Sequence, residues 1–147
     1  MTILLFNGPR NPLSNLFRIK GGFHYKGHFF YSVEQAYQWR KADFHGYRNT
    51  AEKILALSDP YRIKSAGHFN TIKEWDREKV NIISELLHIK SQICTEFKDA
   101  LTLSFPKVLV EDTGNEFWGR GKTGSGHNTL GCLLIQLRTQ ILTAPMC

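Results

Sequence analysis

The segment from Asp76 to Leu101 constrains the fold most, because apolar residues recur in it three or four positions apart. This spacing places side chains on one face of an α-helix. One helix of this length is unusual in a small domain, so we expect two helices with a break between Lys90 and Thr95. Trp75 is expected to pack where the first helix begins. The predicted core residues of the segment are Val80, Ile83, Leu86 or Leu87, Ile93, Phe97 and Leu101.

Shorter segments add a small β component, so the predicted fold class is mainly α with some β structure (α+β). Thr2–Phe6 has the pattern of a short buried strand, and Pro106–Glu111 that of a second strand. Phe23–Tyr31 alternates aromatic and polar residues around Gly27, which predicts a hairpin. The length fits one hydrophobic core, so we expect a single domain over residues 1–147.

Helix signals account for most of the remaining chain. Ala51–Leu57 has a helical pattern, and Asp59-Pro60 starts a further helix that should stop at Gly67. Asn128 is predicted to cap a final helix. That helix carries Leu130, Leu133, Leu134, Leu137 and Ile141 on one face.

The stretch Ser32–Ala42 has the clearest helix start in the chain. Ser32 is followed three residues later by Gln35, which is the spacing of a capping box. In that motif the serine side chain accepts from an unpaired backbone N–H, and the glutamine reaches back to the cap residue. The helix should end near Gly46.

One face of this predicted helix is chemically unusual. Glu34, Tyr37, Gln38 and Lys41 fall at positions i, i+3, i+4 and i+7, so they share a stripe. A solvated stripe with a Glu–Lys pair is the ordinary interpretation of such a pattern. A site that uses a carboxylate and an amine is the alternative.

The loop Thr113–Gly126 holds five of the twelve glycines. Gly119–Gly124 matches G-x-G-x-x-G, but too little chain follows it for a dinucleotide-binding fold. A P-loop is excluded as well, because Glu116 stands where its first glycine belongs. Trp118 could stack on a base or plug the core, and the backbone N–H groups near Asn128 suit a phosphate.

Charge and cysteine content narrow the class of protein. The net charge of +6 favours anionic ligands, although it could equally serve solubility. No apolar run is long enough for a membrane helix, and the first residues lack the pattern of a signal peptide. Cys94, Cys132 and Cys147 are far apart, which indicates reduced thiols and a cytoplasmic, intracellular protein. The scattered histidines predict no metal site.

Three ordered blocks of the sequence resemble the NADAR, or YbiA-like, family. The first is Phe6 followed by the LSNLF segment 13–17. The second is SVEQAYQ at 32–38, followed by Lys41-Ala42. The third runs from Glu111 through WGRG at 118–121 and NTLG at 128–131 to Arg138. Each block alone would be weak, but together they cover nearly the whole chain in family order.

This resemblance implies an N-glycosidase that acts on ribosyl linkages, with a compact YbiA-like helical domain. Activities associated with the family are hydrolysis of early riboflavin-pathway intermediates and removal of ADP-ribose from guanine bases of nucleic acid. The expected substrate is therefore an ADP-ribosyl or ribosyl-phosphate compound, either free or on DNA or RNA. No cofactor, metal or membrane partner is implied, and the oligomeric state stays open.

Residue roles follow from the same resemblance. Glu34 would be the general base or the stabiliser of a ribosyl cation, and Lys41 an imine-forming nucleophile or a phosphate partner. Lys64 and Gly67 resemble a further family step that supplies a phosphate-side cation, although Lys64 also fits a surface lysine. The residues expected to bind substrate are Ser14, Asn15, Tyr37, Gln38, Trp118, Gly119, Arg120 and Asn128.

Two departures from the family pattern keep other functions open. Asn115 and Glu116 stand where the family usually has an aspartate before Trp-Gly, and Arg120 adds a cation after it. The altered acid motivates a second hypothesis, a non-catalytic ADP-ribose- or NAD-binding module. A basic nucleic-acid-binding domain without pocket chemistry is the third.

Overall fold

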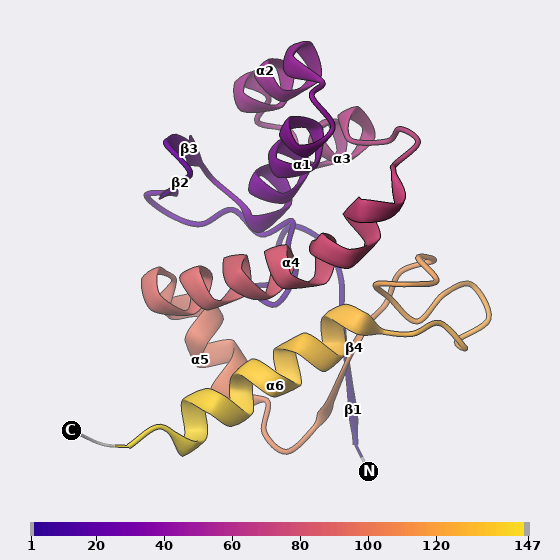
Figure 1. Ribbon diagram of the computed structural model, residues 1–147. Coiled ribbons are helices and arrows are strands. Elements are labelled where there is room, and N and C mark those ends of the chain that lie inside the picture. The colour runs from indigo at the N-terminus through magenta and orange to yellow at the C-terminus, as the bar shows by residue number, and fades with distance from the viewer. Residues whose placement is uncertain (1, 146–147) are drawn as a thin grey trace. The chain divides into compact units, whose positions relative to one another are not determined.

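The computed structural model describes residues 2–145, in which the chain forms two compact units. One unit combines the N-terminal segment up to Ser14 with the chain from Cys94 onward, and the other spans Asn15–Ile93. Six helices and four short strands are present in the described residues (Figure 1). This content confirms the predicted α+β class, in which helices dominate. The prediction of a single domain stays a prediction.

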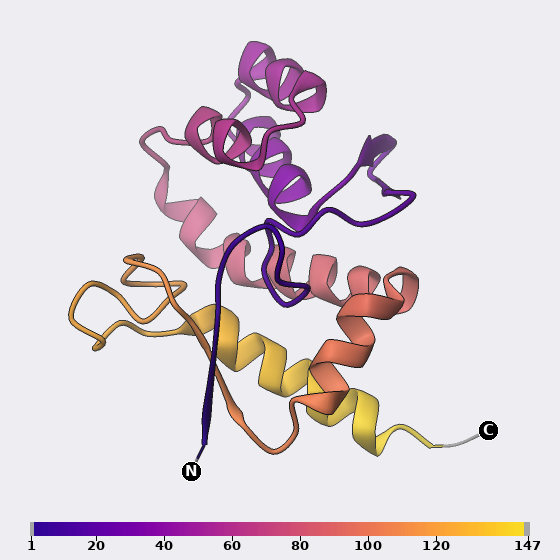
Figure 2. The same cartoon turned by 180° about the vertical axis from the view of Figure 1, so that it is seen from behind.

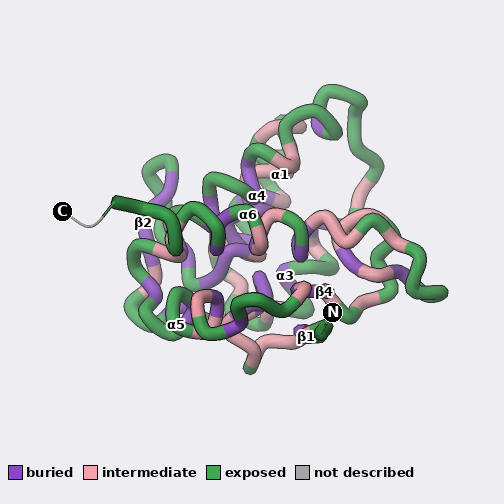
Figure 3. Tube along the Cα trace, turned by 90° about the horizontal axis from the view of Figure 1, so that it is seen from below, coloured by how far each residue is buried: buried purple, intermediate pink, exposed green. Residues whose placement is uncertain are grey.

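The unit Asn15–Ile93 is organised around one central helix, α1 (Val33–Phe44). This helix contacts the other three helices of the unit and the second strand of a hairpin. Most of its length is buried (Figure 3). The surrounding elements are β2 (Phe23–Tyr25), β3 (His28–Phe30), α2 (Arg48–Ala56), α3 (Pro60–Ala66) and α4 (Lys73–Ile93).

The start of α1 confirms the predicted cap but not the complete capping box. Ser32 Oγ accepts a 3.1 Å hydrogen bond from the N–H of Gln35. The Gln35 side chain does not reach back to Ser32, because its Oε1 accepts from the N–H of Tyr31. Its Nε2 donates to the carbonyls of Ile54 and Leu57 at the end of α2. Gln35 therefore fixes the packing of α2 against α1.

The predicted break in the long helical segment is confirmed at Cys94. The helix α4 ends at Ile93, Cys94 is extended, and α5 covers Thr95–Leu103. Ile93 was expected in the core, which is wrong, because 45% of its surface is exposed. The chain leaves the helical conformation at the next residue, so helical spacing no longer directs this side chain inward. Lys90, in contrast, is fully buried.

The unit that contains both chain ends is built on a two-stranded parallel sheet. The strand β1 (Ile3–Phe6) pairs with β4 (Val108–Glu111), and Leu4 lies opposite Leu109. The helix α6 (Thr129–Thr143) packs on β4, and α5 packs on α6 (Figures 1 and 2). The expected burial of β1 is wrong, since 58% of Ile3 is exposed. A single helix covers only one face of so small a sheet.

Arg138 ties α6 to the segment that leads into β4. Its Nη1 donates to Ser104 Oγ at 2.9 Å and to the carbonyl of Lys107 at 2.8 Å. Burial lowers the pKa of this guanidinium. The residue therefore has a structural role in this unit.

The remaining predictions concern membrane-spanning helices, metal sites and cysteines. No helix in the described part of the chain is long and apolar enough to span a membrane. Residues 2–145 contain no cluster of three His, Cys, Asp or Glu side chains placed to hold a metal ion. Cys94 and Cys132 are free thiols, and Cys147 lies outside the described residues.

Candidate functional site

The stripe on α1 is a partly enclosed cluster rather than a solvated face. Gln38 is only 7% exposed, and Glu34 is partly accessible. Gln38 Nε2 donates a 2.8 Å hydrogen bond to Glu34 Oε1, one helical turn away. This bond fixes the orientation of the carboxyl group.

Lys41 lies one turn further along α1 and points towards the end of α3. Its Nζ donates a 2.6 Å hydrogen bond to the carbonyl of Gly67, the C-cap residue of α3. The same Nζ lies 4.8 Å from the centroid of the Phe69 ring. The amine is therefore held in one place by a carbonyl and an aromatic face.

The environment moves the pKa values of Glu34 and Lys41 in opposite directions. Burial raises the pKa of the Glu34 carboxyl above its usual range, against the hydrogen bond from Gln38 and the charges of Lys64 and Lys41. Burial lowers the pKa of the Lys41 amine, assisted by the charge of Lys79 and opposed by Glu34. Both shifts favour the uncharged forms, and perturbed pairs of this kind are frequent in active sites.

Two further lysines join the cluster from other helices. Lys64 on α3 and Lys79 on α4 act electrostatically on Glu34 and Lys41 respectively. Lys79 also pairs with Asp76 at 3.0 Å. Lys64 therefore adds positive charge to the cluster, while that of Lys79 is shared with Asp76, and this suits an anionic ligand. Only Lys64 could be suspected from the sequence, because no local spacing connects Lys79 with α1.

The loop after α3 is fixed to α1 by two contacts. A Cβ at Gly67 would overlap the Gln38 amide, so the close approach of this loop requires glycine. His45 Nε2 accepts from the N–H of Ile72, so its Nδ1 carries the proton that is donated to the carbonyl of Lys41. His45 therefore joins the end of α1 to the end of the loop. No local pattern in the sequence indicates this role.

Asn15 meets the start of α1 through its backbone. Its backbone carbonyl accepts a 3.0 Å hydrogen bond from the N–H of Glu34. Its Oδ1 is buried without a hydrogen-bond partner, and so is Oε1 of Gln38. Both oxygens are enclosed by the protein, and Gln38 Oε1 lies against Gly67.

Tyr37 lies on the same stripe of α1, but its ring packs against another aromatic ring. Its ring centroid lies 5.5 Å from that of Trp75, which is almost fully buried. The expected packing role of Trp75 is confirmed. Tyr37 thus links the stripe to the core of its unit.

The other predicted site residues belong to the unit that contains the chain ends, so they are described separately. Ser14 is buried, and its N–H donates to the carbonyl of Asn11. Trp118 is partly exposed, with its ring 4.8 Å from that of Phe117. Trp118 is therefore not a fully buried core plug.

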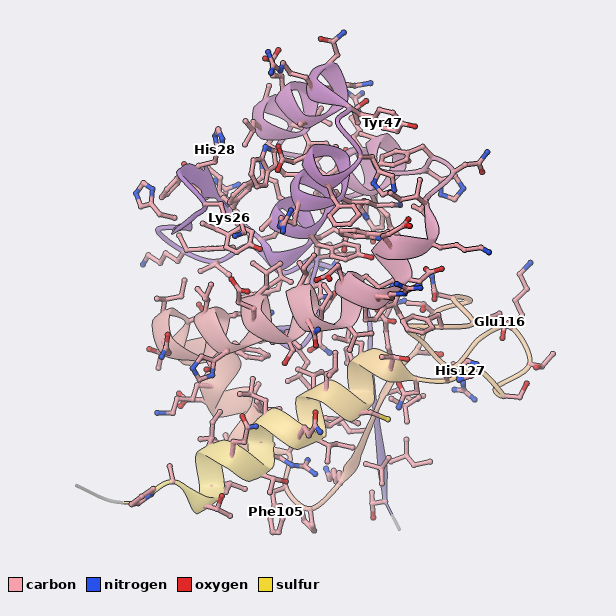
Figure 4. All side chains as sticks on the ribbon, in the orientation of Figure 1. Lys26, His28, Tyr47, Phe105, Glu116 and His127 are labelled. Atoms are coloured by element: carbon pink, nitrogen blue, oxygen red, sulfur yellow. The ribbon has the colours of Figure 1, made fainter. Side chains whose placement is uncertain are left out.

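Asn115 organises the turn that presents Trp118. Its Oδ1 accepts hydrogen bonds from the N–H groups of Phe117, at 2.9 Å, and Trp118, at 2.7 Å. An aspartate oxygen would accept the same two bonds. Asparagine can thus serve the turn that the family usually builds with an acid. Glu116 and His127 lie at the outer part of this loop, where the N–H of His127 donates to the Glu116 carbonyl (Figure 4).

Asn128 precedes α6 but does not cap it with its side chain. Its Oδ1 accepts from the N–H of Glu111 and its Nδ2 donates to the carbonyl of Leu109, so it holds β4. The capping prediction is wrong because Asn128 is left-handed, with φ of 51°. The N–H groups of residues 128–130 donate to the carbonyls of Gly119, Phe117 and Trp118. These N–H groups are therefore already hydrogen-bonded within the protein. They are not open to a phosphate, contrary to the expectation from the sequence.

Gly119 and Arg120 both have partners within the loop. A Cβ at Gly119 would overlap the Thr113 hydroxyl, so glycine is required sterically. Arg120 pairs with Asp112 at 3.5 Å in an exposed ion pair. The cation after Trp-Gly is therefore partly neutralised.

A separate groove in the unit Asn15–Ile93 involves none of the predicted site residues. It has a volume of about 540 Å³ and is lined by His28, Trp39, Asp43, Gly46 and one side of α2 from Arg48 to Leu55. Its acidic, basic and apolar groups are mixed.

Comparison with known proteins identifies one family and its relatives. The NADAR domain model matches residues 6–142. N-glycosidase YbiA of Shigella boydii serotype 4 is 37% identical over 94 residues, which are 61% of this chain and 59% of that protein. The match therefore spans less than two thirds of the curated relative.

Two further matches extend over more of the chain. The chloroplastic riboflavin biosynthesis protein PYRR of Zea mays is 34% identical over 122 residues, which are 76% of this chain and 20% of that protein. The NMR structure of Escherichia coli YbiA superposes with a TM-score of 0.76 at 29% identity. It covers 96% of this chain and 85% of that one.

Proposed function

This chain belongs to the NADAR family, and from that premise we propose that it is an N-glycosidase that hydrolyses a ribosyl N-glycosidic bond. The observation that carries the proposal is the arrangement of Glu34 and Lys41 on one face of α1, each held by a hydrogen bond and each with its pKa shifted by burial towards the uncharged form. A carboxyl group with a raised pKa can protonate a leaving nitrogen. An amine with a lowered pKa can act as a nucleophile.

The proposed reaction begins at the anomeric carbon. The C1′–N bond breaks, its electron pair leaves with the base, and the base takes the proton of the Glu34 carboxyl. The resulting carboxylate stabilises the positive charge on the ribosyl group. The neutral amine of Lys41 then bonds to C1′.

An imine follows when the sugar ring opens. Nζ loses a proton to the Glu34 carboxylate, the C1′–O4′ bond breaks as the C1′=N bond forms, and Glu34 returns the proton to O4′, which leaves a protonated imine. Water hydrolyses the imine, which releases the sugar aldehyde and the free amine. Direct attack of water on C1′, with the Glu34 carboxylate as base, is the competing route. The lowered pKa of Lys41 supports the imine.

The charges around the cluster favour a phosphate-bearing substrate. Lys64 and Lys79 bring positive charge to Glu34 and Lys41 from two other helices. We propose ADP-ribose attached to guanine in nucleic acid as the substrate. A ribosylamino nucleotide of the riboflavin pathway is the second candidate, supported by the similarity to PYRR.

A non-catalytic ADP-ribose-binding module is the alternative function. The reason for considering it is that this chain lacks the aspartate that the family usually has before Trp-Gly. Asn115 makes the two turn bonds that an aspartate would make. The change of residue therefore gives no reason to expect a loss of activity.

A substrate panel under single-turnover conditions tests the proposal. Excess protein is incubated with ADP-ribosylated single-stranded DNA, ADP-ribosylated RNA and ribosylamino-pyrimidine phosphates, and released sugar is quantified by mass spectrometry. We expect release of ADP-ribose from guanine. Calorimetric binding of ADP-ribose with no product over hours would support the binding module instead.

A further inference from the structure

The chain before Glu34 contains no acidic residue, although it contains four Lys or Arg residues. Three of these, Arg18, Lys20 and Lys26, lie in or beside the β2–β3 hairpin. All three side chains are exposed. The hairpin is therefore positively charged, with no carboxylate of its own segment to neutralise it.

The two faces of the hairpin differ in composition. Phe23, Tyr25 and Phe30 are buried, and the Phe30 ring lies 5.6 Å from Trp39 on α1. Strand alternation turns the residues between them to the opposite face. There His24 is the cross-strand partner of Phe29.

The outward residues form a continuous series of planar groups, which we call the hairpin strip (Arg18, His24, Phe29 and Tyr31). The Arg18 guanidinium carbon lies 4.0 Å from the centroid of the Tyr31 ring. The Tyr31 and Phe29 centroids are 5.0 Å apart, and so are those of Phe29 and His24. Phe29 is 38% exposed and Tyr31 39% exposed. Neighbouring rings meet edge to face, with interplanar angles of 88° for Phe29–Tyr31 and 63° for His24–Phe29, so a flat ligand would stack on a single exposed ring rather than on one continuous plane.

We propose that the hairpin strip binds single-stranded nucleic acid. Unpaired bases stack on exposed aromatic rings and on guanidinium planes, while lysines meet the phosphates. Arg18, Lys20 and Lys26 supply the positive charge, and residues 18–31 contain no Asp, Glu, Asn or Gln. The strip therefore has stacking and charge but few groups that read base edges, which predicts weak dependence on sequence and sugar.

The strip is joined directly to the helix that carries the candidate site. The N–H of Tyr31 donates to Gln35 on α1, and Ser32 begins that helix. A strand bound here lies close to the start of α1, where Glu34 is. The binding itself requires none of the catalytic groups. Figure 4 shows Lys26 and His28 at the hairpin.

Fluorescence anisotropy with a labelled, unmodified oligothymidine of about 12 nucleotides tests this inference. Three phosphate contacts should give a slope of about −2 for log K against log salt concentration. We expect Phe29→Ala and Tyr31→Ala each to weaken binding about tenfold. Lys20→Gln and Lys26→Asn should each reduce the slope by about 0.7. Asparagine is chosen because Lys26 has φ of 49°, which asparagine tolerates.

Matched controls lie outside the strip. Tyr61→Ala removes an exposed aromatic ring from α3, and Lys98→Gln removes an exposed charge from α5. Both should bind like the unchanged protein. RNA of the same length should bind within about threefold of the DNA.

Several results would overturn the inference. Unchanged affinity in both aromatic variants and an unchanged slope in both lysine variants would do so. Tighter binding of duplex DNA, or binding to anionic vesicles without binding to the oligonucleotide, would also contradict it. The lysine variants keep the test valid if an aromatic variant fails to fold. Because the probe is unmodified, the outcome does not depend on catalysis.

Discussion

Lys41 Nζ and the Gly67 carbonyl are joined by a hydrogen bond of 2.6 Å, which connects the face of α1 that carries the candidate site to the C-cap of α3. The bond fixes the position of an amine that a long, flexible side chain would otherwise leave free. Gly67 also lies directly against Gln38, the residue that orients Glu34. One backbone position thus supports both candidate catalytic residues.

The substitution Gly67→Ala should therefore impair turnover more than folding. A Cβ would displace the Gln38 amide, and with it the carboxyl of Glu34. We expect kcat to fall about tenfold or more and the free energy of unfolding to drop by about 1–3 kcal/mol. Steady-state kinetics and thermal unfolding measure both. Gly114→Ala is the control, because its Cβ would meet only Lys122 at 3.5 Å. Equal kcat for the two variants would contradict this role.

The imine route assigns a covalent bond to Lys41. Borohydride added during turnover should reduce the imine and leave a stable sugar adduct on the protein. Peptide mass spectrometry should locate it at Lys41 and find none in Lys41→Ala. Lys41→Arg, which keeps the charge but cannot form the imine, should also be inactive. An active protein without an adduct would favour direct attack by water.

The raised pKa of Glu34 makes stability depend on pH. The folded state favours the protonated carboxyl. The stability that Glu34 contributes is therefore complete below the usual carboxyl pKa and is lost as the pH rises through the pKa of Glu34 in the folded state. Glu34→Gln keeps a neutral group at every pH. We therefore expect the variant and the unchanged protein to unfold at similar temperatures at about pH 4, and the variant to be more stable at about pH 8. If the difference in unfolding temperature between the two proteins does not change with pH across this range, ionisation of Glu34 does not destabilise the folded state.

Lys64 and Lys79 should affect different kinetic constants. Removing the charge with Lys64→Gln should raise KM about threefold to tenfold for substrates with a diphosphate, and less for those without phosphate. Lys79 lowers the pKa of Lys41, so Lys79→Gln should raise that pKa and shift the pH–rate profile towards higher pH. Lys98→Gln, on the exposed side of α5, is the control for both. Identical effects of all three substitutions would indicate only a change of net charge.

Local spacing was sufficient to predict the elements that carry the site. The Ser32 cap and the break at Cys94 follow from signals within a few residues of chain. Helical geometry likewise brought Glu34 and Gln38 together one turn apart. Their burial could not be read from the sequence, because it depends on which helices cover α1.

The remainder of the site depends on tertiary packing. Lys79 and the Gly67 carbonyl reach Lys41 from other helices, whose packing angles no local pattern specifies. Asn128 was placed correctly before α6, but a left-handed backbone turns its side chain to β4. Asn115 shows the same limit, since its turn bonds become evident only in three dimensions.

The most direct test of the proposed chemistry compares single-turnover release of ADP-ribose from modified guanine by the unchanged protein and by Glu34→Gln. We expect the rate constant of the variant to be about 10²–10⁴-fold lower, with unchanged ADP-ribose affinity measured by calorimetry. A variant that releases ADP-ribose at the original rate would contradict the assignment of Glu34 and the mechanism built on it.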